Sequence, residues 1–227
     1  MIKTRCRLCN SKKLYQFLDL GNQPPSDQFK FKDQLNNVTN YYPLRVNHCL
    51  KCGFKQLNYV VDPKILYQQN YPYESSLTNE GKKHYKEFAD SVVENFNLSR
   101  NDLTVDIGSN TGTLVNAFKQ NNLKAIGIDP APNICKIANK KKNKTYNSFF
   151  NLAIVNKILK IHGKAKVVTG TNVFAHIDDL ITFIKNIKKI LDPKKGICVI
   201  EVPHFLHLIN KLEYDTIYHE HLSYITV

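Results

Sequence analysis

From Leu103 onward, short apolar runs alternate with amphipathic stretches, and this order constrains the fold more than any other feature of the sequence. The runs have the length and the Val and Ile content of buried strands, whereas the stretches between them have helical spacing. A repeated order of strand and helix implies a mostly parallel sheet with helices on both faces. We therefore expect a doubly wound α/β fold. The expected strands are LTVDIG, KAIGID, KTYNSFF, AKVVTG and GICVIEV.

Two expectations concern the core of this α/β domain. The clearest predicted helix carries one face of aliphatic side chains, which should be buried against the sheet. Cys135 and Cys198 lie among apolar residues and are expected to be core positions as well. The aliphatic face consists of Ile177, Leu180, Ile181, Ile184, Ile187 and Leu191.

Four of the six cysteines are paired by spacing, as Cys6-x-x-Cys9 and Cys49-x-x-Cys52. The N-terminus shows no export signal, which argues against a disulfide framework. Two such pairs supply the four thiolates that tetrahedral zinc prefers, and Gly53 permits a tight turn after the second pair. We predict a structural zinc site with these four ligands; a redox role for either pair is the lesser alternative.

The chain is expected to consist of three parts. Residues 1–59 are rich in turns and predict a small irregular domain that bound zinc helps to fold. Residues 60–102 are predicted to form a connector and one helix, in which Phe88, Val92, Val93 and Phe96 recur at helical spacing. Residues 103–227 are predicted to form the larger α/β domain.

A glycine-containing loop, VDIGSNTGTL, follows the first expected strand. Gly108 and Gly112 clear side chains from the turn at which a ligand approaches the backbone most closely in this fold. Asp129 ends the next strand about 20 residues later, where an acidic residue accepts hydrogen bonds from ribose hydroxyls. The spacing is not G-x-G-x-x-G, and Asp106 suits a ligand with a positive amino group. The loop therefore resembles the S-adenosylmethionine site of class I methyltransferases.

The formal net charge of +13 arises from 32 Lys and Arg against 19 Asp and Glu. Many of the lysines lie in runs without interleaved aromatic residues, which is typical of solvated helix faces rather than of nucleic-acid sites. Such a field would also attract a smaller polyanion, such as a nucleotide with a diphosphate. No apolar run approaches the ~20 residues of a membrane-spanning helix. We expect no membrane partner, no nucleic-acid partner and a cytoplasmic location.

The succession of motifs along nearly the whole chain resembles the sugar C-methyltransferases of deoxysugar biosynthesis. This resemblance implies a zinc-binding N-terminal domain and a Rossmann-like class I methyltransferase domain. It also implies methyl transfer from S-adenosylmethionine to a ring carbon beside a ketone, on a nucleotide-linked keto-deoxysugar. The matching segments are LDLGNQPPSDQF, YPLRVNHCLKCG, NYPYESSLTNEGKKH, VDIGSNTGTL, GIDPAPNI, NVFAHIDD, EVPHF and YDTIYHEHLSY.

The same resemblance implies which residues act. A carbon becomes nucleophilic only when a proton leaves, and a histidine with a pKa of about 6.5 suits that task. Tyr218, Glu220 and His221 are placed in the catalytic region with His221 as the favoured base, while Glu220 orients a histidine or takes the proton itself. Tyr73 and His176 are expected beside the sugar. The implied cofactor-binding residues are Asp106, Gly108, Ser109, Asn110, Gly112, Asp129 and Asn172; His204, His207 and His219 are expected to be structural.

Members of that family continue past YHEH into a further α/β domain, so the resemblance implies that this chain lacks the family's C-terminal domain. Two alternatives stay open. One is an RNA methyltransferase with a zinc module, which would explain the basic charge; the chain has TGTNVFAH where an Asn/Asp-Pro-Pro-Tyr motif would stand. The other is a catalytically incomplete fragment that binds the cofactor without performing chemistry.

Overall fold

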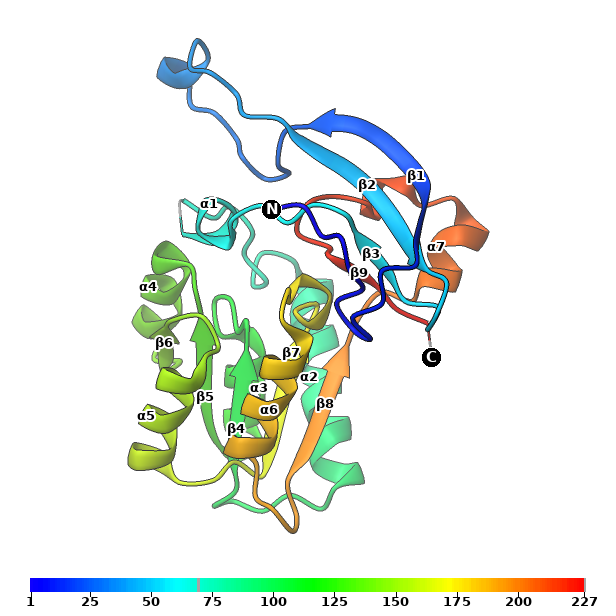
Figure 1. The fold of residues 1–227 in the computed structure, drawn as a ribbon. Coiled ribbons are helices and arrows are strands. Elements are labelled where there is room, and N and C mark those ends of the chain that lie inside the picture. The colour runs from blue at the N-terminus through cyan, green and yellow to red at the C-terminus, as the bar shows by residue number, and fades with distance from the viewer. Residues whose placement is uncertain (69, 227) are drawn as a thin grey trace. The chain divides into compact units, whose positions relative to one another are not determined.

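The structure is a computed structural model that describes residues 1–68 and 70–226. Its chain divides into two compact units (Figure 1). The cysteine unit consists of Met1–Tyr67, Asn172–Ile181 and Glu201–Val227, and the parallel-sheet unit consists of Gln68–Thr171 and Thr182–Ile200. The predicted domain boundaries at residues 59 and 102 stay predictions.

A five-stranded sheet forms the centre of the parallel-sheet unit, with the strand order β6-β5-β4-β7-β8. Strand β4 pairs in parallel with both β5 and β7, and β5 pairs in parallel with β6. The expected doubly wound α/β fold is confirmed. The strand order reverses beside β4, and ligands of such sheets bind beyond the carboxyl ends of the strands at that position. The bounds are β4 Leu103–Ile107, β5 Lys124–Asp129, β6 Thr145–Asn147, β7 Val167–Thr171 and β8 Ile197–Glu201.

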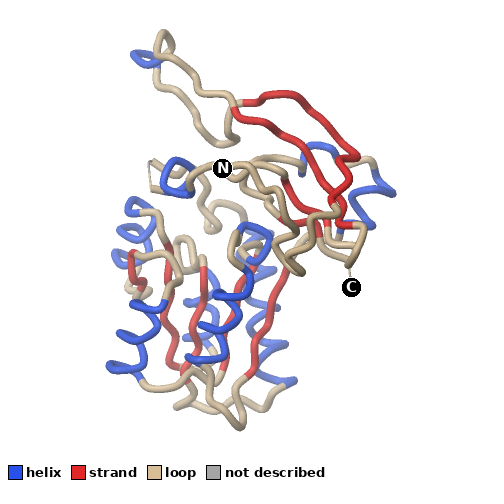
Figure 2. The backbone as a smooth tube through the Cα atoms, in the orientation of Figure 1, coloured by secondary structure: helices blue, strands red, loops and turns tan. Residues whose placement is uncertain are grey.

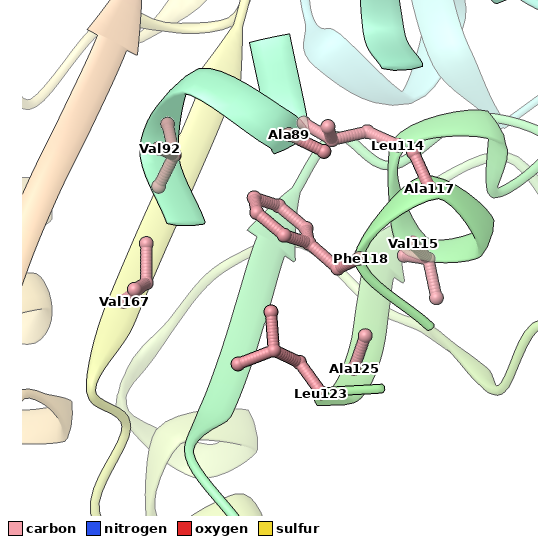
Figure 3. Packing of buried hydrophobic residues seen from close by; sticks show 9 residues of the cluster. All are labelled: Ala89, Val92, Leu114, Val115, Ala117, Phe118, Leu123, Ala125 and Val167. Carbon is pink, nitrogen blue, oxygen red and sulfur yellow. The ribbon is translucent and has the colours of Figure 1, made fainter. Parts of the chain in front are cut away.

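Helices cover both faces of this sheet, with α6 on the face opposite to α2 and α3 (Figure 1). The ring of Phe118 is fully buried between α2, α3 and the sheet, where it lies near Val92 and Leu123 (Figure 3). The side chain of Thr78 caps α2 by accepting a hydrogen bond from the backbone of Gly81. The bounds are α2 Asn79–Asn95, α3 Thr113–Gln120, α4 Pro132–Lys140, α5 Leu152–His162 and α6 Leu180–Ile190.

Two core predictions for this region are wrong. Ile181 and Ile184 of α6 are exposed by 45% and 46%, because the helix buries a different stripe. Cys198 is exposed, because it lies on β8 at the edge of the sheet, whereas Cys135 is buried as predicted. The buried residues of α6 are Leu180, Phe183, Asn186, Ile187 and Ile190, a stripe that includes an aromatic residue absent from the predicted aliphatic face.

An antiparallel sheet with the order β1-β2-β3-β9 organises the cysteine unit (Figure 2). The prediction of an irregular N-terminal domain is wrong in this respect, because β1 and β2 form a long hairpin. Strand β9 pairs Tyr224 with Lys55, so residues far apart in the sequence share one sheet. The strand bounds are β1 Leu14–Gln23, β2 Tyr42–Cys49, β3 Lys55–Leu57 and β9 Ser223–Tyr224.

Short helices complete the cysteine unit. They are α1 Pro63–Tyr67, α7 Phe205–Lys211 and the 3-10 helices η1 Lys32–Gln34, η2 Phe174–His176 and η3 Tyr214–Thr216. Phe205 packs with Leu222 and Tyr224 in an apolar cluster over the sheet, together with Leu44, Val46, Leu57 and Val60. In the part of the chain that the structure describes, no helix has both the length and the apolar character needed to span a membrane.

Candidate functional site

The four paired cysteines of the cysteine unit converge on one point. All four Sγ atoms lie within 4.8 Å of one another, and the Sγ distances from Cys6 to Cys52 and from Cys9 to Cys49 are both 3.6 Å. A tetrahedral zinc ion with Zn–S bonds of about 2.3 Å places its sulfur ligands about 3.8 Å apart. The size of the thiol cluster therefore fits a tetrahedral zinc ion.

Tight turns of the backbone aim these thiols. The backbone N–H of Gly53 donates to the carbonyl of Cys49 at 2.8 Å, and Gly53 adopts a φ of 77°, which favours glycine. Burial raises the pKa of Cys49, but hydrogen bonds from the backbone of Cys52 and Lys51 outweigh burial and lower that pKa to about 6. Cys49 is therefore predisposed to the thiolate form that binds a metal.

The glycine-containing loop lies at the carboxyl end of β4 in the parallel-sheet unit. The backbone N–H groups of Gly108 and Ser109 both donate to the carbonyl of Ile128 in β5, at 2.7 and 3.1 Å. Gly112 begins α3 with a φ of 77°, and an added Cβ would lie 2.6 Å from the Cβ of Asn143. The loop thus lies close against the next strand, and Gly112 has no room for a side chain.

Two buried carboxylates flank this loop. Asp129 accepts hydrogen bonds of 2.9 Å from the backbone N–H groups of Asn110 and Ala131, one on each oxygen. Burial raises the pKa of Asp129, and these two hydrogen bonds oppose the rise. Asp106 accepts a hydrogen bond of 2.8 Å from the hydroxyl of Thr169. Burial raises the pKa of Asp106 to about 7, Thr169 opposes the rise, and the charge of Asp129 adds to it.

The side chains of the loop residues have uses of their own. The amide of Asn110 donates to the carbonyl of Tyr73 at 3.0 Å, and its side-chain oxygen accepts from the backbone of Ser75 at 2.8 Å. The Ser109 side chain lies against Gly127, where an added Cβ would come within 2.2 Å of the serine Oγ. The backbone N–H groups from Gly108 to Gly112 thus all donate within the protein, and the side chain of Asn110 fastens the connector segment that carries Tyr73.

A group of aromatic and imidazole rings forms a second candidate centre, within the cysteine unit. The ring centroids of His176 and His221 are 5.1 Å apart. Nδ1 of His176 and the hydroxyl of Tyr67 are hydrogen-bonded at 3.2 Å, and Nε2 of His221 and the hydroxyl of Tyr218 at 2.8 Å. The structure thus brings together three of the predicted catalytic residues, His176, Tyr218 and His221.

The protonation of His221 follows from its partners. Its Nδ1 lies 2.8 Å from the carbonyl of Thr216, which can only accept, so Nδ1 carries the hydrogen. Nε2 is then the basic nitrogen, and it accepts from Tyr218. Burial lowers the pKa of His221, and Thr216 opposes this effect. Burial, followed by repulsion from His221, lowers the pKa of His176 to about 3, so both rings are neutral at neutral pH.

Four other predicted residues are not part of this ring pair. Glu220 is buried, and His219 is buried with its Nε2 3.2 Å from the carbonyl of Tyr42. Tyr73 belongs to the parallel-sheet unit and is 56% exposed. Asn172 belongs to the cysteine unit, has a φ of 55° and donates through its backbone to the carbonyl of Glu201.

Sequence reasoning missed three groups that hold the candidate site residues in place. They are the hydroxyl of Tyr67 on His176, the carbonyl of Thr216 on His221 and the hydroxyl of Thr169 on Asp106. Tyr67 and Thr169 are separated from their partners by 109 and 63 positions, so no local pattern joins them. Thr216 acts through its backbone, which carries no residue signal at all.

Two protein families match the chain. Residues 6–67 match the family described as "Putative zinc binding domain", and residues 81–227 match the family described as "Methyltransferase domain". Among curated proteins, the chain is 30% identical over 222 residues to C-methyltransferase NovU of Streptomyces niveus. That match covers 98% of this chain and 52% of NovU, so the chain spans about half the length of this curated relative.

Solved structures with similar folds were also found. One is an S-adenosylmethionine-dependent methyltransferase from Clostridium acetobutylicum, with a TM-score of 0.48 and 18% identity over 58% of this chain and 54% of that chain. Another is a SAM-dependent methyltransferase from Archaeoglobus fulgidus, with a TM-score of 0.48 and 17% identity over 60% of this chain and 61% of that chain.

Proposed function

Because the chain belongs to the family described as "Methyltransferase domain" and joins it to a four-thiol zinc site, we propose that it is a sugar C-methyltransferase. The predicted combination of a zinc-binding domain with a class I methyltransferase domain is confirmed, and with it the expectation of zinc and S-adenosylmethionine. The proposed acceptor is the ring carbon beside the ketone of a nucleotide-linked keto-deoxysugar. C-methyl transfer in the name of NovU supports a carbon acceptor.

The observation that carries this proposal is the state of His221. A C-methyltransferase needs a neutral base, because its acceptor carbon must lose a proton before it can attack. His221 is buried with a lowered pKa, and its hydrogen bond to Thr216 leaves Nε2 as the basic nitrogen.

In the proposed reaction, Nε2 of His221 takes the proton from the carbon beside the ketone. The electrons of that C–H bond form an enolate, whose oxygen needs a hydrogen-bond donor as its charge develops. The hydroxyl of Tyr218, which donates to Nε2 in this structure, is the proposed donor once Nε2 has taken the proton. When bound, S-adenosylmethionine would supply the electrophilic methyl group for the enolate carbon, and the bond from methyl to sulfur would break as the new bond forms.

The remaining residues bind rather than react in this proposal. Asp129 and the loop from Gly108 to Gly112 hold the nucleoside part of the cofactor, and Asp106 provides negative charge for its amino group. The four thiolates hold zinc as a structural ion, because all four positions of its tetrahedron are taken by protein ligands. Tyr73 and His176 are proposed to face the sugar. The excess of positive charge favours a substrate with a diphosphate.

The test is a methyl-transfer assay with S-adenosylmethionine and a panel of nucleotide-linked keto-deoxysugars. We expect transfer to one of them, with loss of at least 100-fold in kcat for His221→Ala. His207→Ala is the matched control, because His207 is an exposed histidine of α7. Hydrogen exchange at the carbon beside the ketone, in the absence of cofactor, should also require His221. Transfer to RNA, or cofactor binding without transfer to any sugar, would contradict the proposal.

A further inference from the structure

Arg7 stands between the two cysteines of the first pair and reaches two other segments of the cysteine unit. Its Nη1 donates to the carbonyl of Ile177 at 2.7 Å and, over 3.4 Å, to that of Asp178. Its Nη2 donates to the carbonyl of Leu222 and, at 2.6 Å, to the hydroxyl of Ser223. One guanidinium therefore joins three parts of the chain that are up to 216 positions apart.

The acceptors of Arg7 directly follow the two histidines of the ring pair. Ile177 comes after His176, and Leu222 comes after His221. The two histidine rings have a centroid separation of 5.1 Å. A displacement of either carbonyl would carry the adjacent histidine with it, because consecutive Cα atoms are fixed 3.8 Å apart. The planar fork of Arg7 thus contacts the backbone directly after both rings, and the carbonyl of Leu222 also accepts from the backbone of Leu57 at 3.0 Å.

The backbone of Arg7 is held by the thiol cluster and by β3. The backbone N–H of Arg7 donates to Oε1 of Gln56 at 2.8 Å, and Nε2 of Gln56 donates to the carbonyl of Arg5 at 3.1 Å. Gln56 is fully buried. Cys6 and Cys9 flank Arg7, so a metal that binds these thiols holds the arginine backbone from both sides.

A second cation, Lys3, binds the segment that follows His176. Nζ of Lys3 lies 2.6 Å from Oδ2 of Asp178, next to the carbonyl that Arg7 binds. The guanidinium also lies over the ring of Phe54, 5.8 Å from its centroid. Burying a cation is costly unless it is hydrogen-bonded, and both Nη atoms of Arg7 have acceptors.

We propose that Arg7 is a positioning residue that makes the spacing of the His176 and His221 rings depend on the four-thiol zinc site. The zinc site then does more than stabilise the N-terminal hairpin. Its geometry is transmitted through one side chain to the two histidines. The link from the zinc site to the two rings is independent of the reaction, and only its effect on turnover rests on the proposed function.

The test compares Arg7→Met with Arg5→Met. Arg5 is an exposed arginine of the same segment whose side chain donates to the carbonyl of Asn10 at 3.1 Å, so it is a matched control. Zinc content and the ring NMR resonances of the eight histidines are measured in both proteins, with assignments from single His→Gln variants. We expect Arg7→Met to keep its zinc, to shift the ring resonances of His176 and His221, and to leave those of His84 and His162 in place. Arg5→Met should shift none of them.

Turnover gives a separate readout. If the proposed function holds, Arg7→Met should lower kcat at least tenfold and leave the KM for S-adenosylmethionine unchanged, and Arg7→Lys should recover only part of the loss because lysine lacks the fork. If no sugar is methylated by the unaltered protein, the proposed function fails, whereas the resonances still decide the role of Arg7.

Ser223→Ala provides the second variant, because it removes one acceptor and leaves the arginine and the thiols intact. It should shift the His221 ring resonance with zinc retained. If Arg7→Met does not fold, this variant alone decides between the outcomes. Unchanged His176 and His221 resonances in a zinc-loaded Arg7→Met protein would overturn the proposal. Equal shifts in the Arg5 and Arg7 variants would overturn it as well.

Discussion

The backbone N–H of Asn110 donates a hydrogen bond of 2.9 Å to one carboxylate oxygen of Asp129. This bond ties the loop after β4 to the end of β5, and a second bond ties the other oxygen to the start of α4 through Ala131. One side chain therefore aligns both turns that approach a ligand at this edge of the sheet.

Replacement of that carboxylate should weaken cofactor binding. Asp129→Asn can no longer accept on both sides, and a hydrogen bond to a charged group contributes about 1.5–3 kcal/mol. We expect the Kd for S-adenosylmethionine to rise by roughly 10- to 100-fold, measured by calorimetry. Asp33→Asn, at an exposed carboxylate in η1, is the control and should bind as the unaltered protein does. Equal affinities for the Asp129 variant and the control would refute this role.

Asp106 should make stability depend on pH. Its folded-state pKa is raised to about 7, above an unfolded value of about 3.9, so the folded state favours the protonated form. The stabilisation is fully present below about pH 4 and is lost as the pH rises through 7. Asp106→Asn stays neutral and keeps an acceptor for Thr169. The variant should gain up to roughly 4 kcal/mol over the unaltered protein between pH 4 and pH 8.

Urea unfolding of both proteins at a series of pH values measures this difference. The free energy of unfolding of the unaltered protein should fall relative to that of Asp106→Asn as the pH increases. Parallel curves across the range would show that Asp106 is ionised at all these pH values. The variant should also bind S-adenosylmethionine more weakly at pH 8, because the proposed partner of the amino group has lost its charge.

The pH dependence of turnover should report His221. Burial lowers its pKa from the ordinary value of about 6.5, so the neutral base persists to a lower pH than in a free imidazole. We expect kcat/KM for the sugar to fall with decreasing pH only below about 6.5. Tyr218→Phe removes the hydrogen bond to Nε2 and should shift the pH at which kcat/KM falls. If the fall of kcat/KM at low pH is unchanged in both Tyr218→Phe and His221→Gln, the base is another residue, with Glu220 as the next candidate.

Loss of one thiol ligand should release the zinc. Cys49→Ser leaves three thiols around a site whose four sulfur atoms fit a tetrahedron, and structural zinc contributes directly to folding free energy. We expect metal analysis to show loss of one zinc per chain and the stability to fall by on the order of several kcal/mol. Cys198→Ser, at an exposed thiol, should change neither quantity. Retention of zinc in Cys49→Ser would remove this cysteine from the ligand set.

Local spacing explains what could be predicted from the sequence. The central strands, the turn at Gly108 and Gly112, and the four thiols each depend on residues within a few positions of one another or on a simple paired pattern. Asp129 could be placed because the two strands that it relates are neighbours in both the sequence and the sheet.

Long-range pairing explains what could not be predicted. The hydrogen bonds of Arg7 to Leu222 and of Tyr67 to His176 join segments whose approach depends on the whole fold. The prediction chose the wrong face of α6 because Ile181 and Ile184 are aliphatic. The helix instead buries Phe183, which offers a larger apolar surface on a neighbouring face. Hydrophobic spacing alone does not show which of two overlapping stripes meets the sheet.

The pairing of β9 with β3 sets an order of events during synthesis. Lys55 and the four thiols leave the ribosome well before Tyr224, its partner in the sheet, is made. At 5–20 residues per second the interval is roughly 10 to 30 s. During that time the guanidinium of Arg7 lacks the carbonyl of Leu222, and the reactive thiols are held by a three-stranded sheet alone. Early capture of zinc would protect the nascent hairpin from oxidation until β9 arrives.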